Sequence, residues 1–269
     1  MAILENPILL PFLRLIVGAL IGKDNLNLYD TVDWQQESDR FVPSNYKYPQ
    51  YYARQNFHGI EGGYLNAIAP VTYDVVTRFA APPSEERLRQ QAISRIENQP
   101  QRILDLGCGT GSSTIALKRK FPQARVTGLD LSPHMLVMAE QKAKKANLTV
   151  DWQQGLAEAN GFSSNSFDLI SIAFLFHETP VHITRQILKE CQRLLEPGGQ
   201  LIVLDGNQKR LRHTPWLIQL FREPYSSVYA AGDVDHWLEE AGLIRIKTQP
   251  VGWISQLSTC FKPVQSSVS

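Results

Sequence analysis

The sequence predicts an α/β fold in which a mostly parallel sheet carries helices on both faces. After residue 100, short apolar segments typical of buried strands alternate with helical segments, and this alternation is the pattern that builds such a sheet. The composition agrees with a globular protein, because 43% of the 269 residues are hydrophobic and 20% are charged. A chain of this length can bury a sizeable core without disulfides or a structural metal.

The individual elements follow from the order of apolar runs, caps and turns. Seven strands are expected, at residues 102–106, 125–129, 149–153, 167–174, 200–205, 244–248 and 253–261. Helices are expected at residues 85–98, 111–120, 133–147, 182–195 and 234–241. Ser84 before two glutamates is typical of a helix N-cap, and residues 196–199 (Glu-Pro-Gly-Gly) predict a turn. In a sheet of this kind ligands bind at the carboxyl ends of the strands.

The segment before the sheet has a different composition. Residues 1–83 are expected to form a cap on a core of residues 84–269, which carries a substrate-side insertion near 207–233. An apolar helix is predicted to begin near Pro11, but Pro11 and Arg14 argue against a membrane span. Packing on the core and peripheral membrane contact through residues 8–22 both remain open. Seven aromatic residues between Phe41 and Tyr64 predict irregular structure held by ring packing.

Charge and cysteine content exclude several classes of protein. Lys and Arg number 27 against 26 Asp and Glu, whereas a dedicated nucleic-acid protein usually has a basic excess. The three cysteines, Cys108, Cys191 and Cys260, show no pairing or metal-ligand spacing. A cytoplasmic protein with reduced thiols and no metal site is therefore expected. The sequence does not indicate an oligomeric state.

A glycine-rich loop follows the first predicted strand of the core. The segment 105–111 reads Asp-Leu-Gly-Cys-Gly-Thr-Gly, and Asp130 ends the next strand, 19 residues after Gly111. Glycines allow a sharp turn and a close approach to a ligand, and an acid at this place can accept hydrogen bonds from ribose hydroxyls. A nicotinamide-dependent oxidoreductase is the alternative, but its G-x-G-x-x-G fingerprint would place the third glycine at position 112. This chain has Ser112 there, and its third glycine is Gly111.

With these motifs in order, the chain resembles the class I S-adenosylmethionine-dependent methyltransferases, in the small-molecule branch typified by quinone-biosynthesis enzymes. The resemblance covers about residues 85–263 and includes residues 126–133, 165–170 and 194–199. It implies a Rossmann-like fold, with S-adenosyl-L-methionine as cofactor and S-adenosyl-L-homocysteine as product. The cofactor-binding residues that it implies are Asp105, Gly107, Cys108, Gly109, Gly111, Asp130, Leu131, Met135, Ala157, Glu158 and Phe174.

One position departs from the family pattern. The segment 155–158 reads Gly-Leu-Ala-Glu, where the family usually has Gly-Asp-Ala-Glu, so Leu156 replaces the acid that meets the adenine amine. The contact with adenine would be preserved if the backbone of Ala157 recognises the ring, or if the Glu158 carboxylate takes the place of the missing acid. The departure also leaves open an alternative, a non-catalytic regulatory protein that binds the cofactor.

The resemblance places the reacting groups after the fourth strand of the core. His177 and Glu178 follow that strand, and a histidine has a suitable pKa for removing a proton from an acceptor hydroxyl. His177 is the first candidate for general base, Glu178 would orient it or accept the proton itself, and His58 is a further candidate. Oxygen methylation is slightly favoured over carbon or nitrogen methylation. The Asn/Asp-Pro-Pro-aromatic motif of base-methylating enzymes is absent, which argues against a nucleic-acid substrate.

Aromatic residues on both sides of the core are candidates for the acceptor pocket. Aromatic walls suit a small, lipophilic or aromatic acceptor, and the aromatic segment would also suit a lid. The candidate substrate-binding residues are Tyr51, Tyr52, Phe57, Tyr64, Trp216, Tyr225 and Tyr229.

Overall fold

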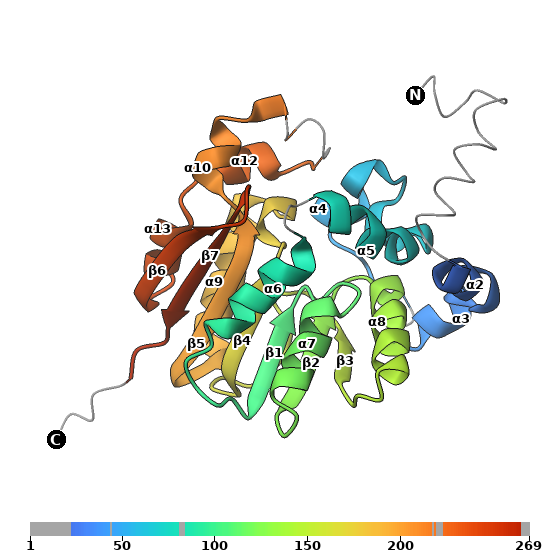
Figure 1. Ribbon diagram of the computed structural model, residues 1–269, viewed down its shortest axis with the longest axis horizontal. Coiled ribbons are helices and arrows are strands. Elements are labelled where there is room, and N and C mark those ends of the chain that lie inside the picture. Colours follow the sequence, from blue (N-terminus) through green and yellow to red (C-terminus); the bar gives the residue numbers. More distant parts are fainter. Residues whose placement is uncertain (1–22, 44, 81–83, 217, 219–222, 265–269) are drawn as a thin grey trace.

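A computed structural model of the chain describes residues 23–43, 45–80, 84–216, 218 and 223–264 (Figure 1). The helix expected near Pro11 and the membrane contact expected through residues 8–22 lie outside the described residues. Among the described residues, no helix has the length and apolar character needed to cross a bilayer.

A single seven-stranded sheet forms the centre of the molecule, in the order β3-β2-β1-β4-β5-β7-β6. Only β7 runs antiparallel to both of its neighbours, β5 and β6. The fold class predicted from the sequence is confirmed. The strands are β1 (Arg102–Leu106), β2 (Arg125–Asp130), β3 (Asp151–Gln154), β4 (Phe167–Ala173), β5 (Leu195–Gly206), β6 (Ile244–Val251) and β7 (Ser255–Phe261).

Successive residues of a strand pack alternately into two separate hydrophobic cores, one on each face of the sheet. In β1, Leu104 and Leu106 belong to the core beneath α9 (Val181–Leu194). Ile103 belongs instead to the core beneath α6 (Glu85–Ser94) and α7 (Ser112–Lys120). This division follows from the twofold periodicity of a strand whose two faces are both covered. The helices of the domain are α6 (Glu85–Ser94), α7 (Ser112–Lys120), α8 (Pro133–Lys145), α9 (Val181–Leu194), α10 (Gln208–Arg212), α12 (Ser226–Ala231) and α13 (Val234–Glu240), with the short 3-10 helix η3 (Phe176–Glu178).

The segment before the sheet packs on α8 and over the carboxyl ends of the strands (Figure 1). Its ring packing was predicted, and Phe57 stacks on Tyr64 with ring centroids 5.0 Å apart. Met135 of α8 belongs to the same apolar cluster. The elements of this cap are α2 (Lys23–Thr31), α3 (Trp34–Asp39), α4 (Gln50–Ala53), η1 (Phe57–Gly59), η2 (Gly63–Leu65) and α5 (Ile68–Ala80).

Several elements differ from those expected, and α4, α10 and α12 are among the helices that were not predicted. Helices α2, α3 and α5 were not predicted, and α5 is rich in β-branched residues, which have modest helix propensity. Its contacts with α8 override that propensity. The turn predicted at residues 196–199 is instead the irregular start of β5, where Gly198 has φ +82° and its N–H donates to the Lys262 carbonyl.

The order of the strands fixes where a ligand can bind. The chain runs outward from β1 to β2 and β3, and then returns to place β4 on the other side of β1. Diverging connections leave a crevice beyond the carboxyl ends of β1 and β4. The glycine loop follows β1 and η3 follows β4, so both predicted motifs meet at this crevice.

Candidate active site

The glycine loop is shaped by backbone conformations that favour glycine. Gly107, Gly109 and Gly111 all have positive φ angles, between +52° and +76°. A Cβ on Gly109 would meet no atom within 4 Å, whereas one on Gly111 would lie 2.8 Å from the ring of Trp152. Gly109 therefore faces open space, and Gly111 allows the close packing of the helix behind the loop.

Asp130 holds the loop from the end of β2. Its Oδ2 accepts the N–H of Gly109 at 2.7 Å, and its Oδ1 accepts the N–H of Ser132 at 2.8 Å. Burial raises the pKa of this carboxyl to about 6, although both hydrogen bonds oppose the rise. At neutral pH the carboxylate is thus ionised and fixed in orientation, with lone pairs left for a ligand hydroxyl.

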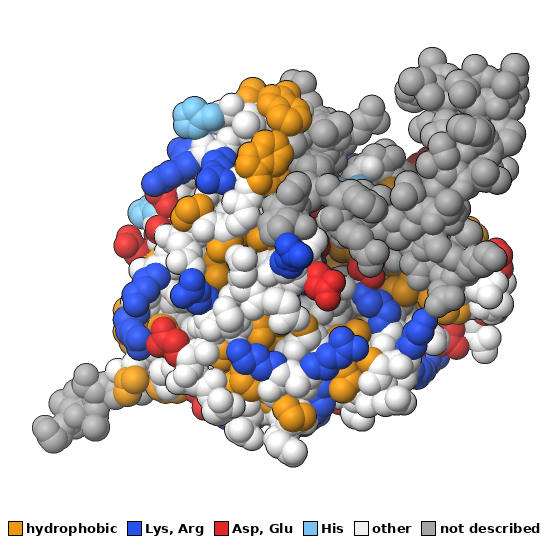
Figure 2. Space-filling model, in the orientation of Figure 1, with side chains coloured by type: hydrophobic (Ala, Val, Ile, Leu, Met, Phe, Trp, Pro, Cys, Tyr) orange, Lys and Arg blue, Asp and Glu red, His pale blue; other side chains and the backbone are white. Residues whose placement is uncertain are grey.

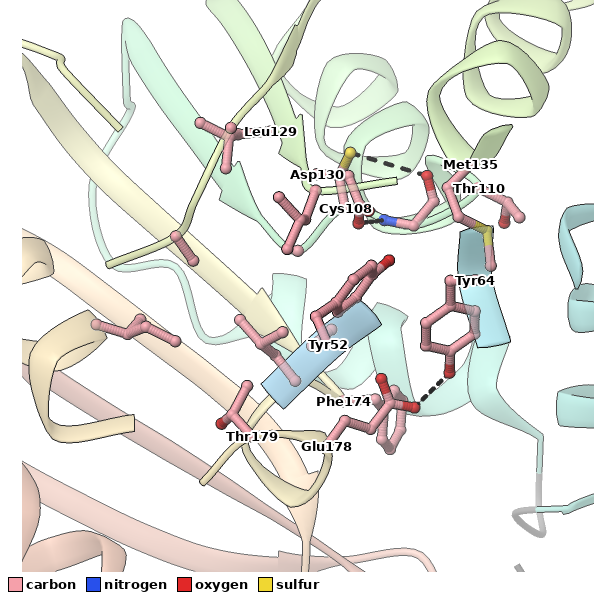
Figure 3. Close-up of a pocket in the computed structure, with 18 of the residues that line it drawn as sticks. Tyr52, Tyr64, Cys108, Thr110, Leu129, Asp130, Met135, Phe174, Glu178 and Thr179 are labelled. Atoms are coloured by element: carbon pink, nitrogen blue, oxygen red, sulfur yellow. Dashed lines mark hydrogen bonds between the residues drawn. The ribbon is translucent and has the colours of Figure 1, made fainter. Parts of the chain in front are cut away.

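A first cavity opens between the glycine loop, β2, the segment after β3 and the cap (Figure 3). Its space is about 780 Å³, including the part open to solvent, which is within the range of small-molecule sites. Nine of the eleven predicted cofactor residues line it: Gly107, Cys108, Gly109, Asp130, Leu131, Met135, Ala157, Glu158 and Phe174.

Glu158 lines the first cavity two residues after Leu156, the position where the family pattern has its acid. Glu158 Oε1 accepts a hydrogen bond from the hydroxyl of Tyr51 at 2.6 Å. Its Oε2 is buried and has no hydrogen-bond partner among the described residues. A buried acceptor without a partner is costly, so this oxygen is suited to receive an amino group from a ligand in the first cavity.

A second cavity adjoins the first and shares part of its wall. Phe174, Glu178 and Tyr73 line both cavities. The second cavity also borders His58, His177 and Glu223, and another part of its wall is apolar. The apolar residues of that wall are Leu211, Ile218 and Ile254.

Two of the residues at this boundary have unusual backbone conformations. His58 has φ +52° and Phe174 has φ +61°. Residues other than glycine rarely adopt these angles, and such strain concentrates at functional sites. The conformation of Phe174 is fixed by its N–H, which donates to the Leu204 carbonyl at 2.8 Å, and by the Arg89 guanidinium, 5.2 Å from the centre of its ring.

Charged side chains gather where the two cavities meet. His58 Nδ1 lies 2.7 Å from Glu223 Oε1, and His58 Nε2 lies 3.4 Å from Glu178 Oε1. The hydroxyl of Tyr64 donates to the same Glu178 oxygen, and the other oxygen points into the first cavity (Figure 3). The ligand atoms of His58, Glu178 and Glu223 lie within 4.8 Å of one another, a spacing that a metal ion would also accept.

His177 has its own acidic partner. Its Nδ1 lies 2.7 Å from Asp205 Oδ1 at the end of β5, and Asp205 also accepts the N–H groups of Phe176 and Gly206. These contacts fix η3 and the ring of His177 together.

The carboxylates determine the protonation of both imidazoles. Burial opposes a charge on His58, but Glu178 and Glu223 outweigh it and raise its pKa to about 10. In the same way Asp205 outweighs burial and raises the pKa of His177 to about 9. Both rings are therefore protonated near pH 7. Burial raises the pKa of Glu178, against the opposing effect of His58.

Two predicted cofactor residues do not border either cavity. The Asp105 carboxylate is buried and accepts a hydrogen bond from the Thr114 hydroxyl at 2.6 Å. It supports the loop from below. Gly111 packs against Trp152 and Ala139. Neither residue lines a described cavity, so their contact with the cofactor stays a prediction.

The predicted substrate residues divide in two groups. Tyr51, Tyr52 and Tyr64 line the first cavity and not the second. Four others line neither: Phe57, Trp216, Tyr225 and Tyr229. Phe57 and Tyr229 are buried in the cores, whereas Trp216 is 55% exposed. Tyr225 ties the insertion to the cap, since its hydroxyl donates to the Tyr51 carbonyl at 2.8 Å.

Several residues of the site were not found from the sequence. Tyr73 and Thr77 come from α5, which was not predicted. Arg89 lines the first cavity and donates to Ser113 and Glu85. An arginine that follows the acidic first turn of a predicted helix is visible in the sequence. Its burial, which would mark it as a site residue, cannot be seen in a single sequence.

Comparisons with known proteins agree with this geometry. A family model described as a methyltransferase domain matches residues 103–199. Residues 103–199 are thus similar to a methyltransferase domain. It is 38% identical over 142 residues to the demethylmenaquinone methyltransferase of Thermus thermophilus, covering 52% of this chain and 63% of that protein. It is also 36% identical over 134 residues to the demethylmenaquinone methyltransferase of Thermotoga maritima, covering 49% of this chain and 56% of that protein. The chain thus spans less than two thirds of these relatives' lengths.

Solved structures of this methyltransferase class share the fold. A Haemonchus contortus phosphoethanolamine N-methyltransferase 2 in complex with phosphomonomethylethanolamine and S-adenosylhomocysteine superposes with a TM-score of 0.61, 15% identity, 82% coverage of this chain and 61% of that chain. Human N-acetylserotonin methyltransferase in complex with S-adenosylmethionine superposes with a TM-score of 0.59 and 18% identity. The match covers 81% of this chain and 61% of that chain.

S-adenosylmethionine is the cofactor of this class, and the first cavity fits it. Gly109 has an open backbone face, the Asp130 carboxylate is fixed in orientation, and Glu158 Oε2 is a buried acceptor without a partner among the described residues. These residues would hold the cofactor backbone, its ribose and its adenine amine. Leu129, Leu131 and Ala157 supply apolar surface around it.

Proposed function

We propose that this protein transfers a methyl group from S-adenosylmethionine to a small lipophilic acceptor that carries an aromatic hydroxyl. The observation that carries the proposal is the second cavity, whose wall is partly apolar and which meets the first cavity at Phe174 and Glu178. When bound, S-adenosylmethionine supplies an electrophilic methyl group on a positively charged sulfonium. The chain then has to align the acceptor and remove its proton.

Glu178 is the residue best placed to accept that proton. Its carboxylate lies on the wall common to both cavities. Oε1 is held by Tyr64 and faces His58, whereas Oε2 receives no hydrogen bond from the described residues. Since a base works best when its pKa approaches the working pH, the raised pKa of Glu178 favours this role.

The histidines then act as cations. A protonated imidazole cannot accept a proton, so the high pKa values of His177 and His58 change the role expected from the sequence. His58 holds Glu178 and Glu223 in place, and it would stabilise a phenolate that forms in the second cavity. His177, bonded to Asp205, lines the same cavity.

The chemical class of the acceptor follows from the walls and from the relatives. Leu211, Ile218 and Ile254 suit an apolar body, and the charged cluster suits one ionisable hydroxyl. The two relatives are named for demethylmenaquinone, a lipophilic quinone. Phenols and hydroquinones with an apolar substituent are therefore the first acceptors to test. Loss of the hydroxyl proton activates both the oxygen and the adjacent ring carbon.

The test is methyl transfer from radiolabelled S-adenosylmethionine to such acceptors, with product structure read by NMR. Glu178→Gln should lower kcat by about 10²- to 10⁴-fold while S-adenosylhomocysteine still binds. The exposed Glu61→Gln is the matched control and should keep full activity. Binding of S-adenosylhomocysteine without methylation of any acceptor would favour the regulatory alternative. A Glu178→Gln variant with wild-type kcat would exclude Glu178 as the base.

A further inference from the structure

We propose that α10 and two neighbouring tryptophans form a surface that docks on an anionic lipid bilayer. This docking surface consists of Lys209, Arg210, Arg212, Trp216 and Trp253. It differs from the membrane contact expected through residues 8–22. Its role in acceptor delivery rests on the proposed function, but its binding to lipid does not.

The two tryptophans are the first observation. Trp216 is 55% exposed and Trp253 is 48% exposed, and their ring centroids lie 6.5 Å apart. Two large aromatic side chains together on a surface are unusual for a part of the molecule that meets only water. Indole combines an apolar ring with one N–H donor, and it partitions to the boundary between lipid chains and head groups.

The charge beside them is the second observation. Lys209, Arg210 and Arg212 are all exposed, and no carboxylate of the described residues forms an ion pair with them. Arg210 reaches across to the carbonyls of Gly252 and Trp253, which joins α10 to the loop that carries Trp253. Figure 2 shows basic and hydrophobic side chains next to each other over α10. Exposed cations beside interfacial aromatics match an anionic bilayer.

The position of the surface is the third observation. The same short segments supply the apolar wall of the second cavity. Leu211 lies between Arg210 and Arg212, Ile218 is two residues after Trp216, and Ile254 directly follows Trp253. The outward side chains thus belong to the docking surface and the inward ones to the cavity. A lipophilic acceptor dissolved in a bilayer would meet this wall of the cavity first.

The experiment is co-sedimentation of the full chain with vesicles of phosphatidylcholine alone and of phosphatidylcholine with a quarter phosphatidylglycerol. The wild type should bind the anionic vesicles and bind the neutral ones weakly. Lys209→Glu/Arg212→Glu should reduce the partition coefficient by about tenfold or more, given the contribution of each basic residue near an anionic surface. Trp216→Ser/Trp253→Ser should reduce it on both vesicle types.

The matched control is Arg87→Glu/Lys247→Glu, which makes the same charge change at exposed positions on other elements. It should change the partition coefficient by less than about twofold, because Arg87 lies on α6 and Lys247 on β6, outside the docking surface. Thermal unfolding of each variant shows that the fold is intact, and each replaced side chain is exposed.

Three results would overturn the proposal. The first is a wild type that does not bind anionic vesicles. The second is an equal fall in the partition coefficient of the α10 and control variants. The third is a wild type that binds RNA but not vesicles. A protein that lacks residues 1–22 provides a further test. If Lys209→Glu/Arg212→Glu lowers its partition coefficient as much as it does in the full chain, the proposal is supported. Because sedimentation involves no methyl transfer, an inactive protein that still binds through this surface would count against the proposed function alone.

Discussion

Replacing Asp130 by asparagine separates cofactor binding from general stability. In the native protein each carboxylate oxygen accepts one backbone N–H, from Gly109 at 2.7 Å and from Ser132 at 2.8 Å. Asparagine has one oxygen, so it can satisfy one of these donors while its NH₂ group faces the other. The glycine loop then loses one of its two anchors, and a ribose hydroxyl loses a charged acceptor.

The expected loss of affinity can be worked from these contacts. A hydrogen bond to a charged group contributes about 1.5–3 kcal/mol. Losing one such bond to the ribose weakens S-adenosylhomocysteine binding roughly 10- to 150-fold. The displaced N–H would add to this loss if it stays without a partner. Isothermal titration calorimetry at pH 7.5 measures the change directly.

Asp168 offers a matched control at the opposite end of the sheet. Its carboxylate also accepts two backbone N–H groups, from Gln101 at 2.8 Å and from Arg102 at 3.0 Å. Asp168→Asn should cost folding stability in the same way and leave S-adenosylhomocysteine affinity within about twofold, since it lies outside both cavities. Affinity that stays within twofold in Asp130→Asn, or that falls equally in both variants, would refute the assignment of Asp130.

Three further outcomes are expected. Because Asp130 has a pKa of about 6, S-adenosylhomocysteine affinity should fall as pH drops from 7 to 5, and calorimetry of Asp130→Asn should show no such fall. This folded-state pKa lies above the usual aspartate value of about 3.9, so ionisation of Asp130 lowers the free energy of unfolding as pH rises from about 4 to 6. Glu158→Gln should narrow the preference for S-adenosylhomocysteine over its inosine analogue, because Glu158 Oε2 then no longer offers a charged acceptor to the amine; an unchanged ratio in competition binding would place the amine elsewhere. Gly128→Ala should lower the free energy of unfolding by about 1–3 kcal/mol, because its Cβ would lie 2.5 Å from the Trp152 ring; urea denaturation should show a smaller change for Gly155→Ala, whose Cβ would lie 3.4 Å from Leu129.

The sequence by itself determined the sheet, its helices and the cofactor motif. Strands with continuous apolar runs, Ser132 followed by Pro133, and closely spaced glycines are local signals, because each reports the conformation of its own few residues. The pairing of Asp130 with the glycine loop could also be predicted, since parallel strands bring their carboxyl ends to one edge.

Tertiary structure alone decided the side of the site that is proposed to hold the acceptor. Helix α5 has weak intrinsic propensity and forms against α8, so Tyr73 could not be placed from the sequence. Similarly, 107 residues separate Tyr51 from Glu158, and 165 separate His58 from Glu223. Whether an aromatic ring lines a cavity or fills a core, and whether a histidine is neutral or charged, depends on neighbours distant in the chain. A single sequence contains the residue types but not their contacts, and those contacts set the pKa values on which the proposed chemistry depends.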